Sequence, residues 1–273
     1  MNLDSYLGRI GLARPLPPNL ETLRALHRAH LHSIPYENLD VQLGRPVTIA
    51  RAPIFEKIVG RGRGGWCYEM NGLFGWALGE LGFRVTRVAG AVMREAMGDA
   101  VVGNHLVLKV ELEEGLHLAD VGFGDGPLEP IRIAAGPFES AGFSYTLTQI
   151  DATWWRLHNH PLGGAKSFDF TLAPADEALL AARCEELQSV AWSPFVQNLV
   201  CQRHTPEGLT ILRGRVVRTV TPCGHADRIL NSADELARFL QEAFDLNLPD
   251  IAALWPRICE RHDAMLASSP KPQ

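Results

Sequence analysis

The chain of 273 residues is 46% hydrophobic and 21% charged, and it carries a formal net charge of −5. This balance is typical of a globular protein, and the negative charge disfavours a nucleic-acid-binding function. The chain contains no run of about 18 consecutive apolar residues and does not begin with a basic, apolar leader, so we expect neither a membrane span nor a signal peptide.

The first third of the chain has the periodicity of amphipathic helices. Leucines recur at helical spacing from Leu20 to Leu31, and Pro35 ends this pattern. A second apolar stripe recurs at three- and four-residue steps from Met70 to Leu81, where Gly82 provides a stop signal. We therefore predict that residues 1 to about 83 are largely helical.

The middle third consists of short segments of strand type, separated by Gly, Pro or Asp residues. They span residues 85–92, 105–112, 116–123, 145–150, 153–157 and 167–172. A series of this kind predicts a compact all-β unit such as a barrel. A helical pattern over residues 175–187 follows Pro174.

The last third mixes strand and helix signals. Residues 209–220 predict a hairpin that turns at Arg213-Gly214. Ser232 and Glu235 form a capping box ahead of an amphipathic helix, and a final helix near residues 251–266 contains Pro256, which should start or kink it. We expect the tail, residues 268–273, to be disordered.

One segment carries the strongest functional signal, the run Arg63-Gly64-Gly65-Trp66-Cys67-Tyr68-Glu69-Met70-Asn71. Cys67 falls in the first turn of the second predicted helix, where unpaired backbone N–H groups and the positive end of the helix dipole favour a nucleophilic thiolate. The two glycines would let a substrate approach the sulfur. A buried structural cysteine is the alternative interpretation.

Cysteine usage indicates a reducing compartment. The five cysteines are odd in number, widely spaced and free of any C-x-x-C pair, so we expect neither a disulfide framework nor a zinc ribbon. We predict a cytoplasmic protein that binds no metal. The segment from Pro222 to His225 lacks a second ligand pair and is predicted to be a loop, and His27, His30 and His32 are predicted to form a solvated helix face.

A reactive thiol needs a base, and the base needs an orienting group. If Glu113 and Glu114 form a two-residue turn, the side chains of His105 and Asp120 share one face of a hairpin, roughly 7–8 Å apart at Cα. A turn at Glu114-Gly115 would separate them further, and a three-residue loop would put them on opposite faces. The alternative roles are a polar strand-edge residue for His105 and a turn residue at the strand end for Asp120.

Four elements resemble signature segments of the arylamine N-acetyltransferase family. The run around Cys67 is similar to the signature R-G-G-x-C-x-E-x-N, and Pro35-Tyr36-Glu37-Asn38-Leu39 is similar to a P-[FY]-E-N-L element. Asn104-His105 and Asp120-Val121-Gly122-Phe123-Gly124 resemble the histidine strand and the D-V-G-F-G segment of that family. The matches follow the family order over residues 35–124, whereas the C-terminal part of the chain matches only loosely.

The resemblance implies an α+β fold with a catalytic core similar to that of cysteine proteases and transglutaminases. Its parts would be an N-terminal helical bundle (residues 1–84), a central β-barrel with an interdomain helix (residues 85–190) and a C-terminal α/β lid (residues 191–273). Cys67 would be the acyl-accepting nucleophile, His105 its base and Asp120 the orienting carboxylate.

The resemblance also implies supporting residues and substrates. Arg63, Glu37 and Asn71 would form a buried network that holds the active-site loop, and Asn104, Phe123 and Gly124 would contact the acyl donor and the acceptor. Acetyl-CoA would be the cosubstrate and an arylamine, arylhydrazine or arylhydroxylamine the acceptor, with ping-pong kinetics through an acetyl-cysteine. We expect a monomer or weak homo-oligomer without nucleic-acid or membrane partners.

Other functions are compatible with the same residues. A transglutaminase-like cysteine amidase or hydrolase shares the order Cys, His, Asp, and an amide synthase is a relative within the acyltransferase class. A catalytically silent binding module would keep a structural thiol only. The cysteine run and the size of the C-terminal third favour acyl transfer.

Overall fold

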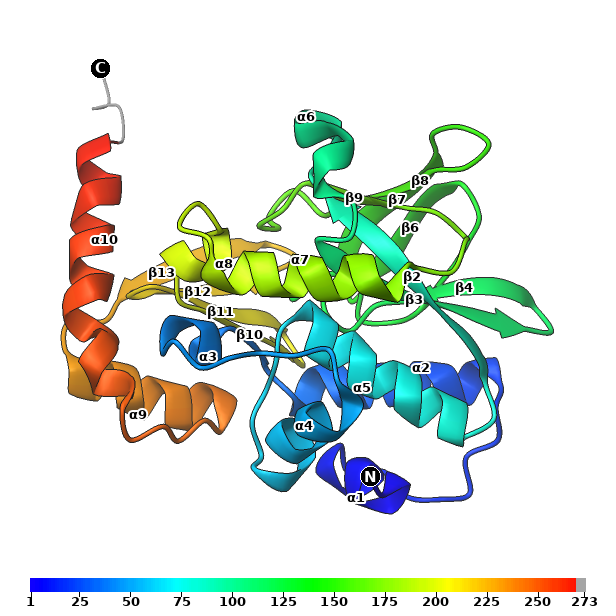
Figure 1. Ribbon diagram of the computed structural model, residues 1–273, viewed down its shortest axis with the longest axis horizontal. Coiled ribbons are helices and arrows are strands. Elements are labelled where there is room, and N and C mark those ends of the chain that lie inside the picture. Colours follow the sequence, from blue (N-terminus) through cyan, green and yellow to red (C-terminus); the bar gives the residue numbers. More distant parts are fainter. Residues whose placement is uncertain (269–273) are drawn as a thin grey trace.

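The computed structural model describes residues 1–268 as an α+β protein (Figure 1). The α-helices are α1 (Leu3–Arg9), α2 (Leu20–Ser33), α3 (Leu39–Gln42), α4 (Arg51–Phe55), α5 (Cys67–Glu80), α6 (Arg94–Met97), α7 (Glu177–Ser189), α8 (Pro194–Gln197), α9 (Ala233–Phe244) and α10 (Trp255–Ser268). A π-helix, η1 (Glu56–Gly60), follows α4, and two 3-10 helices are η2 (Gly98–Val101) and η3 (Ile251–Leu254). No helix of these residues has the length and apolar character needed to cross a membrane.

The strands form two antiparallel sheets. The larger sheet has the order β5-β4-β3-β2-β9-β8-β7-β6, and the smaller has the order β1-β10-β11-β12-β13. Their bounds are β1 (Tyr36–Glu37), β2 (Arg84–Val92), β3 (His105–Leu112), β4 (Gly115–Ala119), β5 (Ile131–Arg132), β6 (Gly136–Ser140), β7 (Phe143–Gln149), β8 (Trp155–His158), β9 (Ser167–Phe170), β10 (Val200–Thr205), β11 (Gly208–Arg213), β12 (Val216–Thr221) and β13 (Gly224–Ile229). The larger sheet is curled but open, because β5 and β6 stand at its two ends without pairing.

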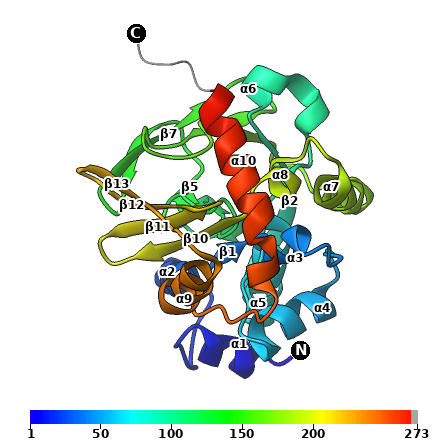
Figure 2. The same ribbon diagram turned by 90° about the vertical axis from the view of Figure 1, so that its left-hand side faces the viewer.

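Three apolar cores surround a central junction, and each core joins a different set of helices and strands. Helices α1, α2, α4 and α5 pack beneath β3 and β4, while α9 and α10 pack on the smaller sheet (Figures 1 and 2). A third apolar cluster fills the curl of the larger sheet. Trp66, Cys67 and Tyr68 lie in a fourth cluster, which also contains α7 residues, so the start of α5 is buried where the parts meet.

Most predicted elements are confirmed, with shifts at their ends. The helix predicted to hold Cys67 in its first turn begins at Cys67, and the final helix begins at Trp255, beside Pro256. The hairpin in the last third turns at Gly214-Arg215, one residue later than predicted, because Arg213 pairs with Val216. Ser268 ends α10 rather than beginning a tail, and the rest of the predicted tail lies outside the described residues.

The second predicted strand of the His105 hairpin is shorter than expected. It ends at Ala119 because the next backbone N–H groups bond to side chains instead of to a neighbouring strand. Val121 N–H donates to Asn71 Oδ1 at 2.9 Å, and Gly122 N–H donates to Asp120 Oδ1 at 2.8 Å. The backbone therefore leaves the sheet at the residues that carry the candidate site.

The prediction of a solvated histidine face on α2 is wrong. His27 and His30 are buried, and His30 Nδ1 lies 2.9 Å from the hydroxyl of Tyr6. His27 reaches the segment after β4, where its Nδ1 lies 2.9 Å from the carbonyl oxygen of Leu128. This face of α2 is covered by segments distant in sequence, so helical periodicity within α2 could not reveal it.

Candidate active site

A buried network of five charged side chains surrounds the loop before Cys67. Arg63 Nη2 lies 2.7 Å from Glu37 Oε1 and 3.2 Å from Asp40 Oδ1. Lys57, which projects from the π-helix η1, lies 3.0 Å from Asp40 Oδ2 and 2.9 Å from both carboxylate oxygens of Glu69. The network joins the segment after β1 to η1 and to the first turn of α5.

The network holds more carboxylates than cations. Burial alone would lower the pKa of Lys57, but the charges of Glu37, Glu69 and Asp40 hold it above its ordinary value. Burial raises the pKa of Glu69 to about 7, against the lowering influence of Lys57. Glu69 shares the Lys57 cation with Asp40, and burial favours the protonated form of the Glu69 carboxyl group.

The two glycines before Cys67 pack against the backbone and do not open a path to the sulfur. A Cβ atom on Gly64 would stand 2.0 Å from the carbonyl oxygen of Pro35, and one on Gly65 would stand 2.7 Å from Cβ of Glu69. Gly65 also bridges to Tyr36 at the start of β1. The glycines therefore allow two chain segments to pack closely, and their predicted role in substrate access stays a prediction.

Cys67 occupies the first position of α5, as predicted, but its environment opposes ionisation. The residue is 2% exposed, and its Sγ lies 4.0 Å from the carbonyl oxygen of Asn104. Burial raises the pKa of the Cys67 thiol above its ordinary value, while hydrogen bonding from the backbone N–H groups of Leu106 and Tyr68 acts in the opposite direction. The helix start alone does not make this thiol a resting thiolate.

His105 and Asp120 form a short contact, and the hairpin adopts the first of the three turns that the sequence left open. Leu112 pairs with Gly115, so Glu113 and Glu114 are the turn, and His105 Nε2 lies 2.7 Å from Asp120 Oδ2. Burial raises the pKa of Asp120, but the charge of His105 and the hydrogen bonds to the carboxylate outweigh it and hold that pKa below its ordinary value. An ionised Asp120 accepts a hydrogen bond from Nε2–H of His105, and this tautomer leaves Nδ1 of the neutral ring without a proton.

Asn71 and His27 hold Asp120 in place. Asn71 Nδ2 donates to Asp120 Oδ1 at 2.7 Å and to the carbonyl oxygen of Leu106 at 2.6 Å. The Asp120 backbone N–H donates to Nε2 of His27 at 3.2 Å, so His27 is neutral in this arrangement. Asn71 thus belongs to the Asp120 cluster and not to the network of Arg63 and Glu37, with which it had been grouped.

Cys67 and His105 line one cavity of about 630 Å³. Its walls are largely apolar and include Phe123, Leu187 and Phe195, and the ring of Phe123 lies 5.6 Å from that of His105. Asn104 also lines the cavity, although its side chain bonds to both backbone groups of Val92.

Gly124 is not among the residues that line this cavity, although its neighbours Phe123 and Asp125 are. Its φ angle is +90°, and a Cβ atom there would stand 1.9 Å from Gln202 Oε1. This close approach to β10 explains why glycine is needed here, and the predicted contact of Gly124 with a cofactor stays a prediction.

Comparison with known proteins agrees with this arrangement. A family model described as N-acetyltransferase matches residues 19–253. The chain is 36% identical to the arylamine N-acetyltransferase of Mycolicibacterium smegmatis, over 92% of this chain and 94% of that protein. It is 34% identical to the Escherichia coli K12 enzyme of the same name, over 91% of this chain and 90% of that protein.

The chain belongs to the arylamine N-acetyltransferase family.

Solved structures of the family have the same fold. The arylamine N-acetyltransferase of Mycobacterium marinum in complex with CoA superposes with a TM-score of 0.85 at 30% identity, over 96% of this chain and 99% of that one. An M. smegmatis N-acetyltransferase in which one cysteine is replaced by glutamine gives a TM-score of 0.85 at 35% identity, over 95% and 98% of the two chains.

In this N-acetyltransferase, the sequence indicated the candidate catalytic residues better than the residues that hold them in place. Lys57, Asp40 and His27 were not predicted as site residues, although each contacts Glu69, Arg63 or Asp120. Lys57 stands beside two apolar residues in a π-turn, which no periodicity indicates. Asp40 directly follows the P-[FY]-E-N-L element, and this position was the only feature of the sequence that could have indicated a role at the site.

Replacing Gly64 by alanine is expected to lower the free energy of unfolding by about 1–3 kcal/mol, because the new methyl group would overlap a backbone oxygen that cannot rotate away. Gly79→Ala is the matched control, since Gly79 lies within α5 with open space at its Cβ position. Helix propensity predicts that this control is stabilised by up to about 1 kcal/mol. Urea denaturation measures both, and equal stability of the two variants would contradict the packing role of Gly64.

Proposed function

We propose that this chain transfers an acetyl group from acetyl-CoA to the nitrogen of an arylamine, arylhydrazine or arylhydroxylamine through an acetyl-Cys67 intermediate. The observation that carries the proposal is the buried His105–Asp120 contact beside Cys67 in one cavity. The family membership supports it, and so does the related M. marinum enzyme, which was solved with CoA.

In the first half-reaction, Nδ1 of His105 accepts the thiol proton while Asp120 holds Nε2–H. This transfer explains how a thiol whose pKa is raised by burial can act as a nucleophile. The sulfur of Cys67 forms a bond to the acetyl carbonyl carbon, and the carbon–sulfur bond to CoA breaks. The departing CoA thiolate takes the proton from His105, which restores the neutral ring.

In the second half-reaction, a neutral aromatic amine attacks the acetyl carbon on Cys67. His105 accepts a proton from the amine nitrogen and returns it to the leaving sulfur of Cys67. The apolar walls of the cavity, with Phe123 and Phe195, suit an aromatic ring and give water little to bond to. We propose that the C-terminal third acts as a lid that keeps water from the acetyl-cysteine.

A single-turnover experiment tests this function. The protein is mixed with acetyl-CoA in the absence of amine, and released CoA is titrated while the protein is digested for mass spectrometry. One equivalent of CoA per chain and the mass gain of one acetyl group on the peptide with Cys67 are expected, followed by release when an arylamine is added. Continuous CoA release without amine would identify a thioesterase, and the absence of any adduct would support the silent binding module.

A further inference from the structure

Tyr36 brings a hydroxyl group to the cavity of Cys67. It is the second residue of the P-[FY]-E-N-L element, where phenylalanine or tyrosine fits the pattern, and it lines the cavity together with Cys67. The residue is 8% exposed and shares an apolar cluster with Cys67 and Leu106. An aromatic ring alone is enough to fill a place in such a cluster, so packing does not account for the hydroxyl group.

The backbone of Tyr36 is held on both sides. On one side, Tyr36 forms a parallel bridge to Gly65, which lies two residues before Cys67. The next N–H group, that of Glu37, donates to the carbonyl oxygen of Gly65 at 2.9 Å. On the other side, Tyr36 pairs with Gln202 of β10. The ring of Tyr36 therefore starts from a fixed point beside the loop that leads to Cys67.

The hydroxyl group of Tyr36 is an unused hydrogen-bond donor. Within residues 1–268 it has no hydrogen-bond partner, and it is not among the enclosed polar atoms that lack one, so it is open to the cavity. Other donors near the site are engaged. Asn104 Nδ2 donates to a backbone oxygen at 3.2 Å, and the backbone N–H groups of Leu106 and Tyr68 bond to the sulfur of Cys67.

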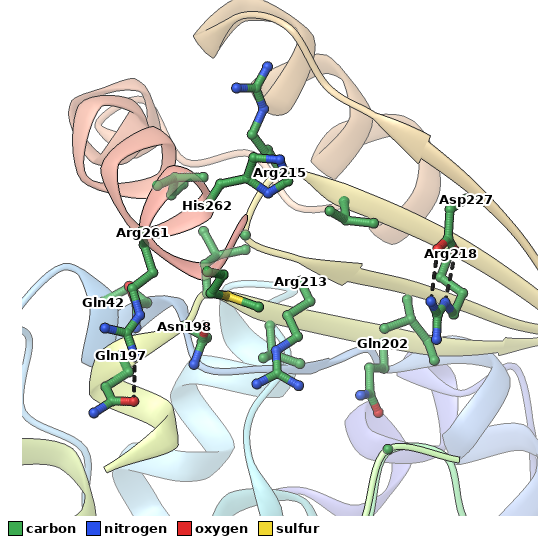
Figure 3. Close-up of a pocket in the computed structure, with 18 of the residues that line it drawn as sticks. Gln42, Gln197, Asn198, Gln202, Arg213, Arg215, Arg218, Asp227, Arg261 and His262 are labelled. Atoms are coloured by element: carbon green, nitrogen blue, oxygen red, sulfur yellow. Dashed lines mark hydrogen bonds and ion pairs between the residues drawn. The ribbon is translucent and has the colours of Figure 1, made fainter. Parts of the chain in front are cut away.

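Tyr36 faces the reacting atoms and not the neighbouring pocket. That pocket measures about 500 Å³ and shares Gln202, the strand partner of Tyr36, with the cavity of Cys67 (Figure 3). Tyr36 is not among the residues that line it. Burial raises the pKa of the Tyr36 hydroxyl, and of the neighbouring charges a thiolate at Cys67 raises it most, ahead of Asp120. The hydroxyl therefore keeps its proton and lies within electrostatic reach of the sulfur.

Both half-reactions of the proposed function place a negative charge on the acetyl oxygen. When the sulfur of Cys67 bonds to the carbonyl carbon, the π electron pair of the carbonyl group moves to the oxygen, and it returns when the carbon–sulfur bond to CoA breaks. The same oxygen takes up charge again when the amine attacks acetyl-Cys67. A hydrogen-bond donor held at this oxygen lowers both barriers, because the charge develops between apolar walls.

We infer that the hydroxyl group of Tyr36 donates a hydrogen bond to the acetyl oxygen in both half-reactions, which makes Tyr36 a further catalytic residue. This inference rests on the proposed function and adds a side-chain donor to it. The hydroxyl group stabilises the oxyanion without giving up its proton, so His105 remains the group that moves protons. Phenylalanine at this position would keep the ring and lose the donor.

Tyr36→Phe tests the inference, because it removes the donor alone. The acetyl oxygen is present in acetyl-CoA, in p-nitrophenyl acetate and in acetyl-Cys67. We expect the second-order rate constant of Cys67 acylation to fall by roughly tenfold to hundredfold with either donor, as for the loss of one hydrogen bond to a charged oxygen. The rate constant for removal of the acetyl group by an arylamine should fall by a similar factor.

Alkylation by iodoacetamide separates an effect on the acetyl oxygen from an effect on the thiol. This reagent consumes the same sulfur by displacing iodide and forms no oxyanion, so Tyr36→Phe should be alkylated at the wild-type rate. A structural disturbance of Cys67 or His105 would slow alkylation as well. Tyr145→Phe is the matched control, because Tyr145 is buried on β7 and is not among the residues that line the cavity. It should react like the wild type throughout.

The possible outcomes differ clearly. Acylation of Tyr36→Phe at the wild-type rate would overturn the inference, and so would an equal loss of rate in acylation and in alkylation. A loss confined to the amine step would also overturn it, because the hydroxyl group would then act on the acceptor. A wild-type protein that acetyl-CoA does not acylate would instead refute the proposed function itself.

Discussion

Replacing Cys67 by alanine is expected to abolish the acetyl adduct and to reduce amine acetylation by about a million-fold, the loss seen when a nucleophile is removed from a comparable triad. Without the sulfur, His105 and Asp120 keep their contact but have no group to activate. The change removes one small buried side chain, so the fold should survive. Steady-state acetylation and mass spectrometry of the intact chain measure the two losses.

Cys184→Ala is the control that separates reactivity from burial. Cys184 lies on α7 and is 2% exposed, as Cys67 is, and burial raises the pKa of its thiol to about 12. This variant should form the adduct at the wild-type rate, because Cys184 does not line the cavity that contains His105. Retained acetyl transfer in Cys67→Ala, or an adduct on Cys184 in the wild type, would show that another nucleophile carries the acetyl group.

Replacing Lys57 by methionine is expected to lower the free energy of unfolding by about 3–5 kcal/mol, because it leaves buried carboxylates without their cation. The ammonium group bonds to Glu69 and Asp40, and its side chain is 5% exposed. Methionine keeps the length of the stem, so the loss reports the charge more than the packing. Chemical denaturation at fixed pH measures it.

The loss of stability in Lys57→Met should grow as the pH rises. Although burial opposes it, the charges of Lys57 and Arg63 hold the pKa of Asp40 below its ordinary value in the native protein. Without Lys57, the pKa values of Asp40 and Glu69 rise in the folded state. A carboxyl group with a raised folded pKa stabilises the fold only while it is protonated, so stability is lost as the pH rises above the unfolded value of about 4.

The variant should therefore be more impaired at pH 8 than at pH 5. Arg28→Met is the control, since Arg28 is 47% exposed and pairs with Glu129 at the surface. Its cost should stay below about 1 kcal/mol. A Lys57→Met variant that loses no more stability than Arg28→Met would refute the structural role of the buried network.

The sequence predicted those parts of the site that depend on neighbours in the chain. Of the three hairpin turns that the sequence left open, the turn at Glu113 and Glu114 is observed, and it puts His105 and Asp120 on one face. The position of Cys67 at a helix start followed from the apolar stripe of α5. In both cases the residues that form the pattern are close in sequence, within one helix or one hairpin, so the pattern is enough to predict the local structure.

The electrostatic surroundings could not be predicted, because they depend on segments far apart in sequence. The raised pKa of the Cys67 thiol reflects burial among elements from all parts of the chain. His27 reaches Asp120 across 93 positions of the sequence, and Asn38 bonds to β10 residue Val200 across 162. Periodicity carries no information on such contacts, since they arise only when the elements pack together.

The pairing of β1 with β10 has a consequence for biosynthesis. Tyr36 and Glu37 lie early in the chain, yet their strand partners are Gln202 and Cys201. During translation, which proceeds from the N-terminus, Cys67 leaves the ribosome long before these partners do. The nascent chain therefore contains Cys67 before Val200 and Gln202, the β10 residues that line the same cavity, have been synthesised. A chain that stops short of β10 therefore keeps Cys67 but lacks part of the wall of its cavity.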